Sequence, residues 1–307
     1  MPQLVDYQVD QTLTSMSKAY QNGKLIGTML MPRLDVPGRT GYYFVYDKSK
    51  FRIEDSRRTG LNEANTVDYG LVKAAFGPLA ERSLQEKIED EVIKTYPSEH
   101  DARVDATENV TENLDLGLEK DIADMLTSGS NITQTVALSG TDRWNDFANS
   151  DPFTDLQTGI DTIKASAMVT PNKLVLGYQV WAKLRHHPDL LGRLSVASIR
   201  VLTPQLLADL IGVEEVLIGD ALYNTADEGQ SDVMSYVWGK NALLAYVRPS
   251  PKIKSISLGY TLQVQDARYV DRWAEPWHKA QVVRANDYYE SKLVAAEAGY
   301  LITTVID

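Results

Sequence analysis

Apolar residues recur at every fourth position through the middle of this chain, over a span that is long for a globular helix. They are Ala102, Ala106, Val110, Leu114, Leu118, Ile122 and Leu126. Ser98 followed by Asp101 is typical of a helix start, and Gly129 of a helix end. The pattern predicts a helix over residues 98–127, about 45 Å long at about 1.5 Å per residue. Because its apolar stripe is one side chain wide, such a helix lies along a surface.

The chain that precedes this helix lacks a core of its own. Residues 1–40 consist of short apolar pieces interrupted by glycine and proline, which predicts an extended arm. An arm of this kind buries too little apolar surface to offset its ordering entropy, so we expect it to lie on another surface. Residues 41–53 and 67–76 predict the two strands of a long hairpin. An isolated hairpin is marginally stable, so it needs support from its own domain or from a partner.

The remainder of the chain divides into two segments with different hydrophobic patterns. Residues 150–250 alternate between helical patterns and short buried strands, which predicts an α/β unit. Helix starts are expected at Ser150-Asp151-Pro152, His187-Pro188 and Thr203-Pro204, with an end at Gly212.

Residues after 250 favour an antiparallel sheet. Strict alternation over 256–264 predicts a half-buried strand, and further strands are expected over 280–285, 291–296 and 300–306. These strands are expected to return to the long helix, so that the α/β unit is inserted into one discontinuous domain.

Composition and motifs exclude several functional classes. The 307 residues include no cysteine, which excludes disulfides, thiolate metal sites and a cysteine nucleophile. Phosphate-binding glycine loops, dinucleotide fingerprints, HExxH and GxSxG motifs are also missing. The net charge of −11 argues against a general nucleic-acid binder. The N-terminal residues have no secretory-signal pattern, and no apolar run is long enough for a membrane span, so we expect a soluble protein.

We predict no catalytic residue, no cofactor and no metal site. One alternative from a different class is a soluble α/β metal-dependent hydrolase with His186, His187 and Asp189 as ligands. Adjacent histidines generally point apart, however, and Pro188-Asp189 is typical of the first turn of a helix.

Charge is distributed unevenly along the chain. Residues 24–60 hold eight basic and four acidic side chains, a net charge of +4, whereas residues 81–127 hold five basic and fourteen acidic ones, a net charge of −9. A basic projection and an acidic helix would attract each other between subunits and set their register. The residues predicted to make these inter-subunit contacts are Arg39, Lys48, Lys50, Arg52, Arg57, Arg58, Glu108, Glu112, Asp115 and Glu119.

Taken in order, these segments resemble the Hong Kong-type fold of the major capsid proteins of tailed bacteriophages. The similar stretches are residues 25–48, PNKLVLG at 171–177 leading into Trp181 and His187-Pro188, SLGYT at 257–261, and GYLI at 299–302. The resemblance covers essentially the whole chain, and it is the order and spacing of these stretches, more than any single one, that makes it specific.

The resemblance implies an α+β fold with four parts. They are an N-terminal arm at 1–38, an extended β-loop at 39–80, a peripheral domain at 81–150 and 251–307 with the long spine helix and an antiparallel sheet, and an inserted α/β axial domain at 151–250. It further implies self-assembly into hexamers and pentamers of an icosahedral shell around double-stranded DNA, in a virion built in the host cytoplasm. In such shells each arm and each loop lies across a neighbouring subunit, which would supply the surface that they lack.

The implied partners are other copies of the chain, a scaffolding protein, a portal and a decoration protein. Contact with packaged DNA would be weak and non-specific, and no membrane is involved. Bacterial encapsulins resemble the same fold but enclose cargo enzymes, so an encapsulin-like shell stays open as an alternative at this point.

Overall fold

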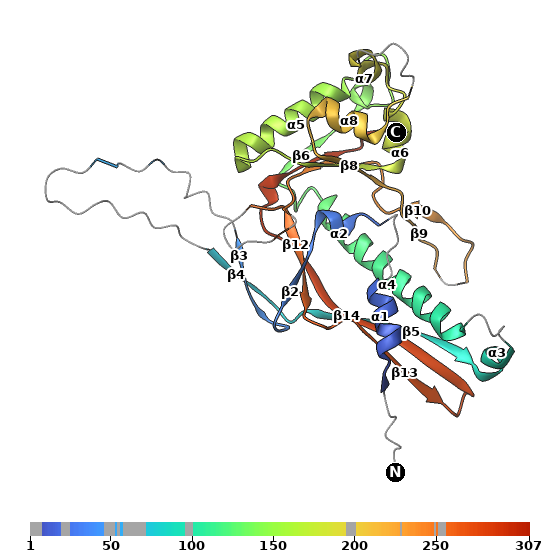
Figure 1. The fold of residues 1–307 in the computed structure, drawn as a ribbon. Coiled ribbons are helices and arrows are strands. Elements are labelled where there is room, and N and C mark those ends of the chain that lie inside the picture. The colour runs from blue at the N-terminus through green and yellow to red at the C-terminus, as the bar shows by residue number, and fades with distance from the viewer. Residues whose placement is uncertain are drawn as a thin grey trace.

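In the computed structural model of this chain, one long helix joins two sheets (Figure 1). The structure describes residues 8–19, 25–45, 53, 56–57, 72–95, 101–194, 201–227, 229–248, 250 and 256–307. The long helix, α4 (Ala102–Leu126), crosses one face of an antiparallel sheet and then reaches a second sheet that helices cover on its other face.

The predicted long helix is confirmed, with a shorter start. Ser98 lies outside the described residues, and Asp101 caps the helix instead, because its side chain accepts a hydrogen bond from the Arg103 amide at 2.9 Å. The helix ends at Leu126, next to the predicted end at 127 and ahead of Gly129, and the Thr127 amide donates to the Ala123 carbonyl.

Six strands form the sheet beneath the first half of α4. They are, in spatial order, β1 (Gln8–Val9), β13 (Tyr269–Glu275), β14 (Ala280–Leu293), β12 (Gly259–Val264) and β2 (Arg33–Val36), with β5 (Ala80–Glu89) paired to β14. All pairs are antiparallel except that of β12 with β2. A short helix, α3 (Asp90–Thr95), follows β5.

Several strand predictions in this sheet are wrong. The strands expected over 280–285 and 291–296 are one unbroken strand, β14, and the prediction missed β13. Polar residues between the two expected strands are satisfied inside the sheet: the Asn286 side-chain amide donates to Asp271, and Asp287 pairs with Arg33.

Strand β12 is also not half-buried as expected. It begins at Gly259, and its first four residues are all buried. The reason is that Gly259 lies against Met31, while Leu262 packs with Phe76 and Leu79.

A mixed five-stranded sheet forms the second unit. Its strands, in spatial order, are β6 (Gln134–Ala137), β15 (Gly299–Thr303), β11 (Ala242–Ala245), β7 (Lys173–Gly177) and β8 (Glu215–Gly219). Strands β6 and β15 come from the stretches that the sequence analysis assigned to the peripheral domain, yet β15 pairs with β11 of the α/β unit and β6 extends the sheet by pairing with β15.

Alternate residues of this second sheet face two different cores. Leu174 and Leu176 pack among the helices that cover one face. Val175, between them, packs on the other face with Ile122 and Leu126 from the end of α4. The long helix is therefore shared by both units.

The covering helices confirm the predicted start signals. They are α5 (Pro152–Ala167), α6 (Tyr178–Leu184), α7 (Pro188–Arg193) and α8 (Pro204–Ile211), with the single turns η2 (Gly140–Asp142) and η3 (Ala296–Ala298) nearby. Asp151, His187 and Thr203 are their side-chain N-caps. Gly212 ends α8 in the left-handed region at φ 82°, as the sequence predicted.

The described part of the arm does not fit the expectation that it needs a partner's surface. Helix α1 (Gln11–Ala19) packs on α4 and β13, and α2 (Gly27–Leu30) packs on α4. Leu13, Leu30 and Met31 are buried against their own chain. The long helix supplies the apolar surface that the short pieces of the arm lack, so that expectation is wrong here.

Two small ribbons complete the fold. The ribbon of β3 (Gly41–Val45) and β4 (Val72–Phe76) confirms the base of the predicted hairpin, and only residues 53 and 56–57 are described beyond it. The ribbon of β9 (Leu222–Asn224) and β10 (Met234–Tyr236) extends from the end of β8. Figure 1 shows the two ribbons on opposite sides of the molecule.

Candidate functional site

The two histidines of the alternative metal site lie in different environments. Arg185 Nε donates to His186 Nε2 at 3.0 Å on the surface. His187 is buried, and the Asp189 amide donates to its Nδ1. Among the described residues, which include all three proposed ligands, no group of His, Cys, Asp and Glu side chains could hold a metal ion.

His187 lies 3.0 Å from Ser150 Oγ, a pairing that resembles a nucleophile and its base. Because Nδ1 accepts a backbone hydrogen bond, the ring proton is on Nε2, which donates to the serine oxygen. The serine hydroxyl in turn donates to the Asp146 carbonyl at 2.7 Å. Burial lowers the pKa of His187, because it disfavours the charged form of the ring. The pair fixes the start of α7, and the serine is not activated.

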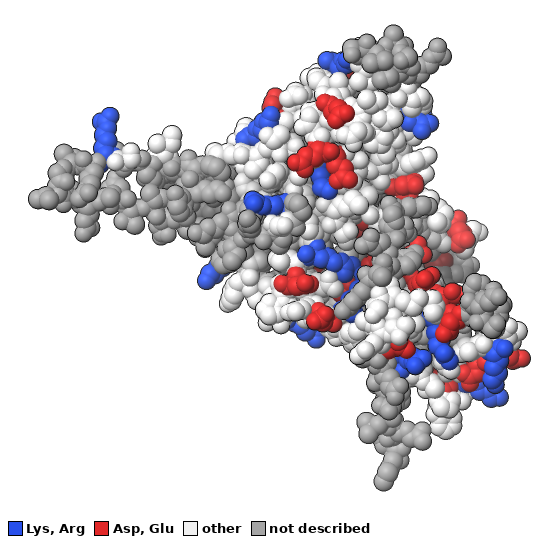
Figure 2. Space-filling model, in the orientation of Figure 1, with Lys and Arg blue, Asp and Glu red and all other residues white. Residues whose placement is uncertain are grey.

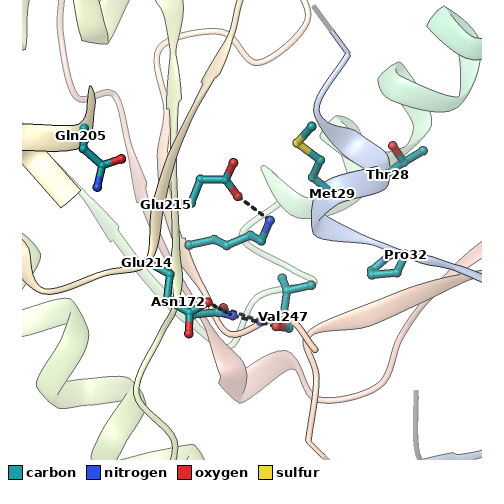
Figure 3. A pocket seen from close by; sticks show the side chains of 9 residues that line it. Thr28, Met29, Pro32, Asn172, Gln205, Glu214, Glu215 and Val247 are labelled. Atoms are coloured by element: carbon teal, nitrogen blue, oxygen red, sulfur yellow. Dashed lines mark hydrogen bonds and ion pairs between the residues drawn. The ribbon is translucent and has the colours of Figure 1, made fainter. Parts of the chain in front are cut away.

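An open groove of about 580 Å³ lies between α2 and the α/β unit (Figure 3). It is lined by Thr28, Met29, Pro32, Asn172, Lys173, Gln205, Glu214, Glu215 and Val247. Polar groups of its lining bind one another. Lys173 Nζ lies 2.8 Å from Glu215 Oε2. The Asn172 side chain donates to the Val247 carbonyl and accepts from the Val247 amide. These pairings hold the end of the sheet together.

Glu119, predicted to contact a neighbouring copy, is instead only 2% exposed inside its own chain. Its carboxylate accepts the Ile26 amide at 3.1 Å, the Gly27 amide at 2.6 Å and Trp238 Nε1 at 2.6 Å. A Cβ at Gly27 would lie 2.7 Å from the carboxylate, so the close approach needs glycine. Burial raises the pKa of Glu119, against the effect of these three donors.

This buried carboxylate joins three parts of the fold: the arm through Ile26 and Gly27, the spine helix, and the α/β unit through Trp238. Sequence analysis missed that role. A signal was available, because Asp115, Glu119 and Ala123 form a second row at spacing four beside the apolar stripe.

Asp115 is likewise engaged within its own chain. Arg268 binds it with two hydrogen bonds of 3.0 Å, and Arg33 approaches it at 3.4 Å while also pairing with Asp287 at 3.1 Å. Arg268 also donates to Ser17 of α1. This cluster ties the arm, α4 and the antiparallel sheet together.

The other predicted contact residues are placed as follows. Arg39 is exposed, with its guanidinium 4.5 Å above the Tyr288 ring. Glu108 and Glu112 lie on the exposed face of α4, and Arg57 is exposed. Lys48, Lys50, Arg52 and Arg58 lie outside the described residues.

Figure 2 draws one face of the molecule, on which acidic and basic side chains are interspersed over much of the surface. Acidic side chains are concentrated over α4 and toward the β9–β10 ribbon, and basic ones occur where the β3–β4 ribbon leaves the body. None of the described helices is long and apolar enough to cross a bilayer.

The whole chain is similar to proteins of phage origin, although no protein-family model matches it. The major capsid protein of Burkholderia phage BcepMu is 30% identical, over 97% of this chain and 96% of that protein. A phage-related protein from Bordetella bronchiseptica is 25% identical and has a TM-score of 0.78, over 98% of this chain and 99% of that one. The capsid structure of cyanophage P-SCSP1u has a TM-score of 0.55 at 12% identity, over 89% and 86% of the two chains, which shows a shared fold alone.

Proposed function

This chain belongs to the phage major capsid proteins, and from that premise we propose that its copies form hexamers and pentamers of an icosahedral shell around double-stranded phage DNA. The observation that carries the proposal is the 30% identity with the BcepMu major capsid protein along nearly the full length of both chains. The protein is a structural component of the virion, and its working partner is itself. A modest interface repeated in closed symmetry makes a stable shell, because several contacts hold each subunit at once.

Each part of the fold has a proposed place in that shell. The α/β unit, residues 151–250, would meet its copies around the five- and six-fold axes. The peripheral domain, residues 81–150 and 251–307, would form the contacts between capsomers. The pairing of β6 and β15 with the α/β sheet leads us to place residues 134–137 and 299–303 with the axial unit.

The charge asymmetry supports a loop that lies across the neighbouring subunit. The basic loop at 39–80 would face the acidic outer side of α4, where Glu108 and Glu112 are exposed. The side chains of Asp115 and Glu119 bind residues of their own chain. They would therefore affect the contact indirectly, by positioning α4. Opposite charges steer the encounter and set its register more than they add affinity.

Other partners follow from the same proposal. A scaffolding protein, a portal and a decoration protein would bind the shell during assembly in the host cytoplasm. The net charge of −11 supports weak, non-specific contact with packaged DNA, because a strongly basic wall would hold the phosphates.

Electron microscopy of the purified protein tests the shell. We expect closed, uniform particles that elute far ahead of a 34.2 kDa chain on size-exclusion chromatography. Elution as a monomer or small oligomer at every concentration would contradict the proposal. Particles isolated from phage-producing cells should contain nuclease-protected DNA, and a protein cargo in its place would favour the encapsulin-like alternative.

A further inference from the structure

The two ribbons on opposite sides of the molecule each expose an apolar outer face. In an antiparallel pair, directly opposed residues lie on the same face and alternate residues on opposite faces. Leu222 opposes Tyr236, and Asn224 opposes Met234, so these four share one face of the β9–β10 ribbon.

The inner face of the β9–β10 ribbon packs against its own chain. Tyr223 faces α4, where the Lys120 ammonium lies 5.2 Å from its ring centroid. On the outer face, Met234 is 59% exposed and Leu222 is 40% exposed, beside a stack of Tyr236 on Tyr178 with ring centroids 5.4 Å apart. Exposed apolar side chains gathered in this way mark an interaction surface.

Hydrogen bonds join the described residues at the two ends of the connection between β9 and β10. Asn224 Oδ1 accepts the amides of Ala226 and Val233, each at 3.0 Å, and its Nδ2 donates to Asp232. Thr225 bonds the Val233 carbonyl through both its amide and its hydroxyl. A ribbon fixed in this way loses little conformational entropy when a partner binds.

The β3–β4 ribbon has the same construction. Its inner face contributes Phe76, which packs with Leu79 and Leu262, and Tyr43 packs beside them. On the outer face Tyr42 opposes Ala75, and Tyr42 is 71% exposed. Lys73 lies on that same face and is exposed.

Charge distinguishes the two outer faces. The β9–β10 connection carries the exposed Asp227 and Asp232, whereas the β3–β4 ribbon carries Lys73, with Arg39 exposed just before β3. Among the described residues, each ribbon thus joins apolar side chains to charges of one sign, and the two signs are opposite. This complementarity favours pairing of unlike ribbons over pairing of like ones.

We propose that the outer face of the β3–β4 ribbon of one copy packs on the outer face of the β9–β10 ribbon of the next copy. The inference rests on the proposed shell and names one receiving surface within it. Because the two ribbons lie on opposite sides of the molecule (Figure 1), the contact joins unlike surfaces and passes around a ring, as a closed capsomer requires.

The natural lack of cysteine makes disulfide trapping a clean test. The double variant Tyr42→Cys with Met234→Cys should, after oxidation of assembled particles, give a ladder of covalent oligomers beyond the dimer on a non-reducing gel. A disulfide needs Cα atoms about 4.4–6.8 Å apart, so the bond reports a direct contact. Dimers from Met234→Cys alone would mean that like ribbons meet, which overturns the proposal, as would particles that yield only monomers.

Charge reversal is a second test that does not require a disulfide. Lys73→Glu and Asp227→Lys, each at an exposed position, should each lower particle yield by about tenfold, because the repulsion recurs in every subunit. The double reversal should restore most of the yield, and circular dichroism should show unchanged folding in all three variants. Wild-type yield from both single variants would overturn the ribbon contact. A wild-type chain that forms no particles would instead overturn the proposed shell itself.

Discussion

The two halves of α4 are held by different kinds of interaction. The first half packs small and medium side chains, such as Ala106 and Val110, against the antiparallel sheet and α1. It ends at Asp115, whose carboxylate binds two arginines. The second half packs Leu118, Ile122 and Leu126 into the core below the α/β sheet. There, the described contacts of the buried Glu119 carboxylate are all with neutral donors.

This difference shows how one helix can couple two units without making them one core. Pairing with arginine compensates the charge of Asp115 at a half-buried position. Among the described residues, Glu119 has only backbone and indole donors, so burying its negative charge is unfavourable and its contribution to stability depends on its protonation. The first half is therefore expected to respond to loss of ion pairs, and the second to loss of packing and to pH.

The largest expected effect comes from truncating matched leucines on either side of the boundary. Leu114, 7% exposed, packs with the antiparallel sheet, and Leu118, 2% exposed, packs with the arm and the α/β sheet. Leu118→Ala and Leu114→Ala should each lower the unfolding free energy of the subunit by about 2–5 kcal/mol in urea titrations, with the larger loss at Leu118.

Hydrogen exchange would show whether the two leucines act on different units. Leu114→Ala should speed amide exchange in β14, and Leu118→Ala in β7 and α2. Equal acceleration in both sheets for both variants would show that the two halves of α4 do not differ in the way proposed.

An intermediate effect is expected at Glu119. Glu119→Gln replaces one carboxylate oxygen with an NH₂ group, which cannot accept the hydrogen bond that this oxygen received. One N–H donor is then left without its acceptor, so the unfolding free energy should fall by about 1–3 kcal/mol. The matched control is Glu108→Gln on the exposed face of the same helix. This variant should change the unfolding free energy by about 0.5 kcal/mol or less. Equal losses in the two variants would argue against a special role for the buried carboxylate.

The pH dependence of the same pair sharpens this comparison. Burial raises the pKa of Glu119 from 4.5, so the folded chain keeps its proton at a pH where the unfolded chain has lost it. As pH rises above 4.5, the unfolding free energy of the wild type should therefore fall relative to Glu119→Gln, and the difference should level off once Glu119 is ionised in the folded chain. A difference that does not change with pH would contradict the proposed burial of the charge.

The smallest effect is expected at the pair of the partly buried Lys120 and the exposed Asp124, one turn apart on α4. Asp124→Ala should change the unfolding free energy by about 0.5 kcal/mol or less, and added salt should remove the difference. A loss comparable to that at Leu118 would show that ion pairs also hold the second half of the helix.

Local signals made much of the fold predictable. The spacing of apolar residues located α4, and the capping residues of α5, α7 and α8 marked where those helices begin. These features depend on residues within one or two turns of each other, and the sequence displays them directly. The unbroken course of β14 was not predictable, because Asn286 and Asp287 look like a break until Asp271 and Arg33 are seen to satisfy them.

The sequence by itself determined the long helix, the order of the units and the separation of basic and acidic segments, because each follows from local periodicity or composition. Only the tertiary structure decided that Asp115 and Glu119 turn into their own chain, that the arm lies on α4, and that β6 and β15 complete the α/β sheet. Such outcomes depend on residues that are distant in the sequence. The donors to Glu119, for example, are 90 or more residues away from it, and spacing along a chain does not encode which distant donor will meet a buried carboxylate.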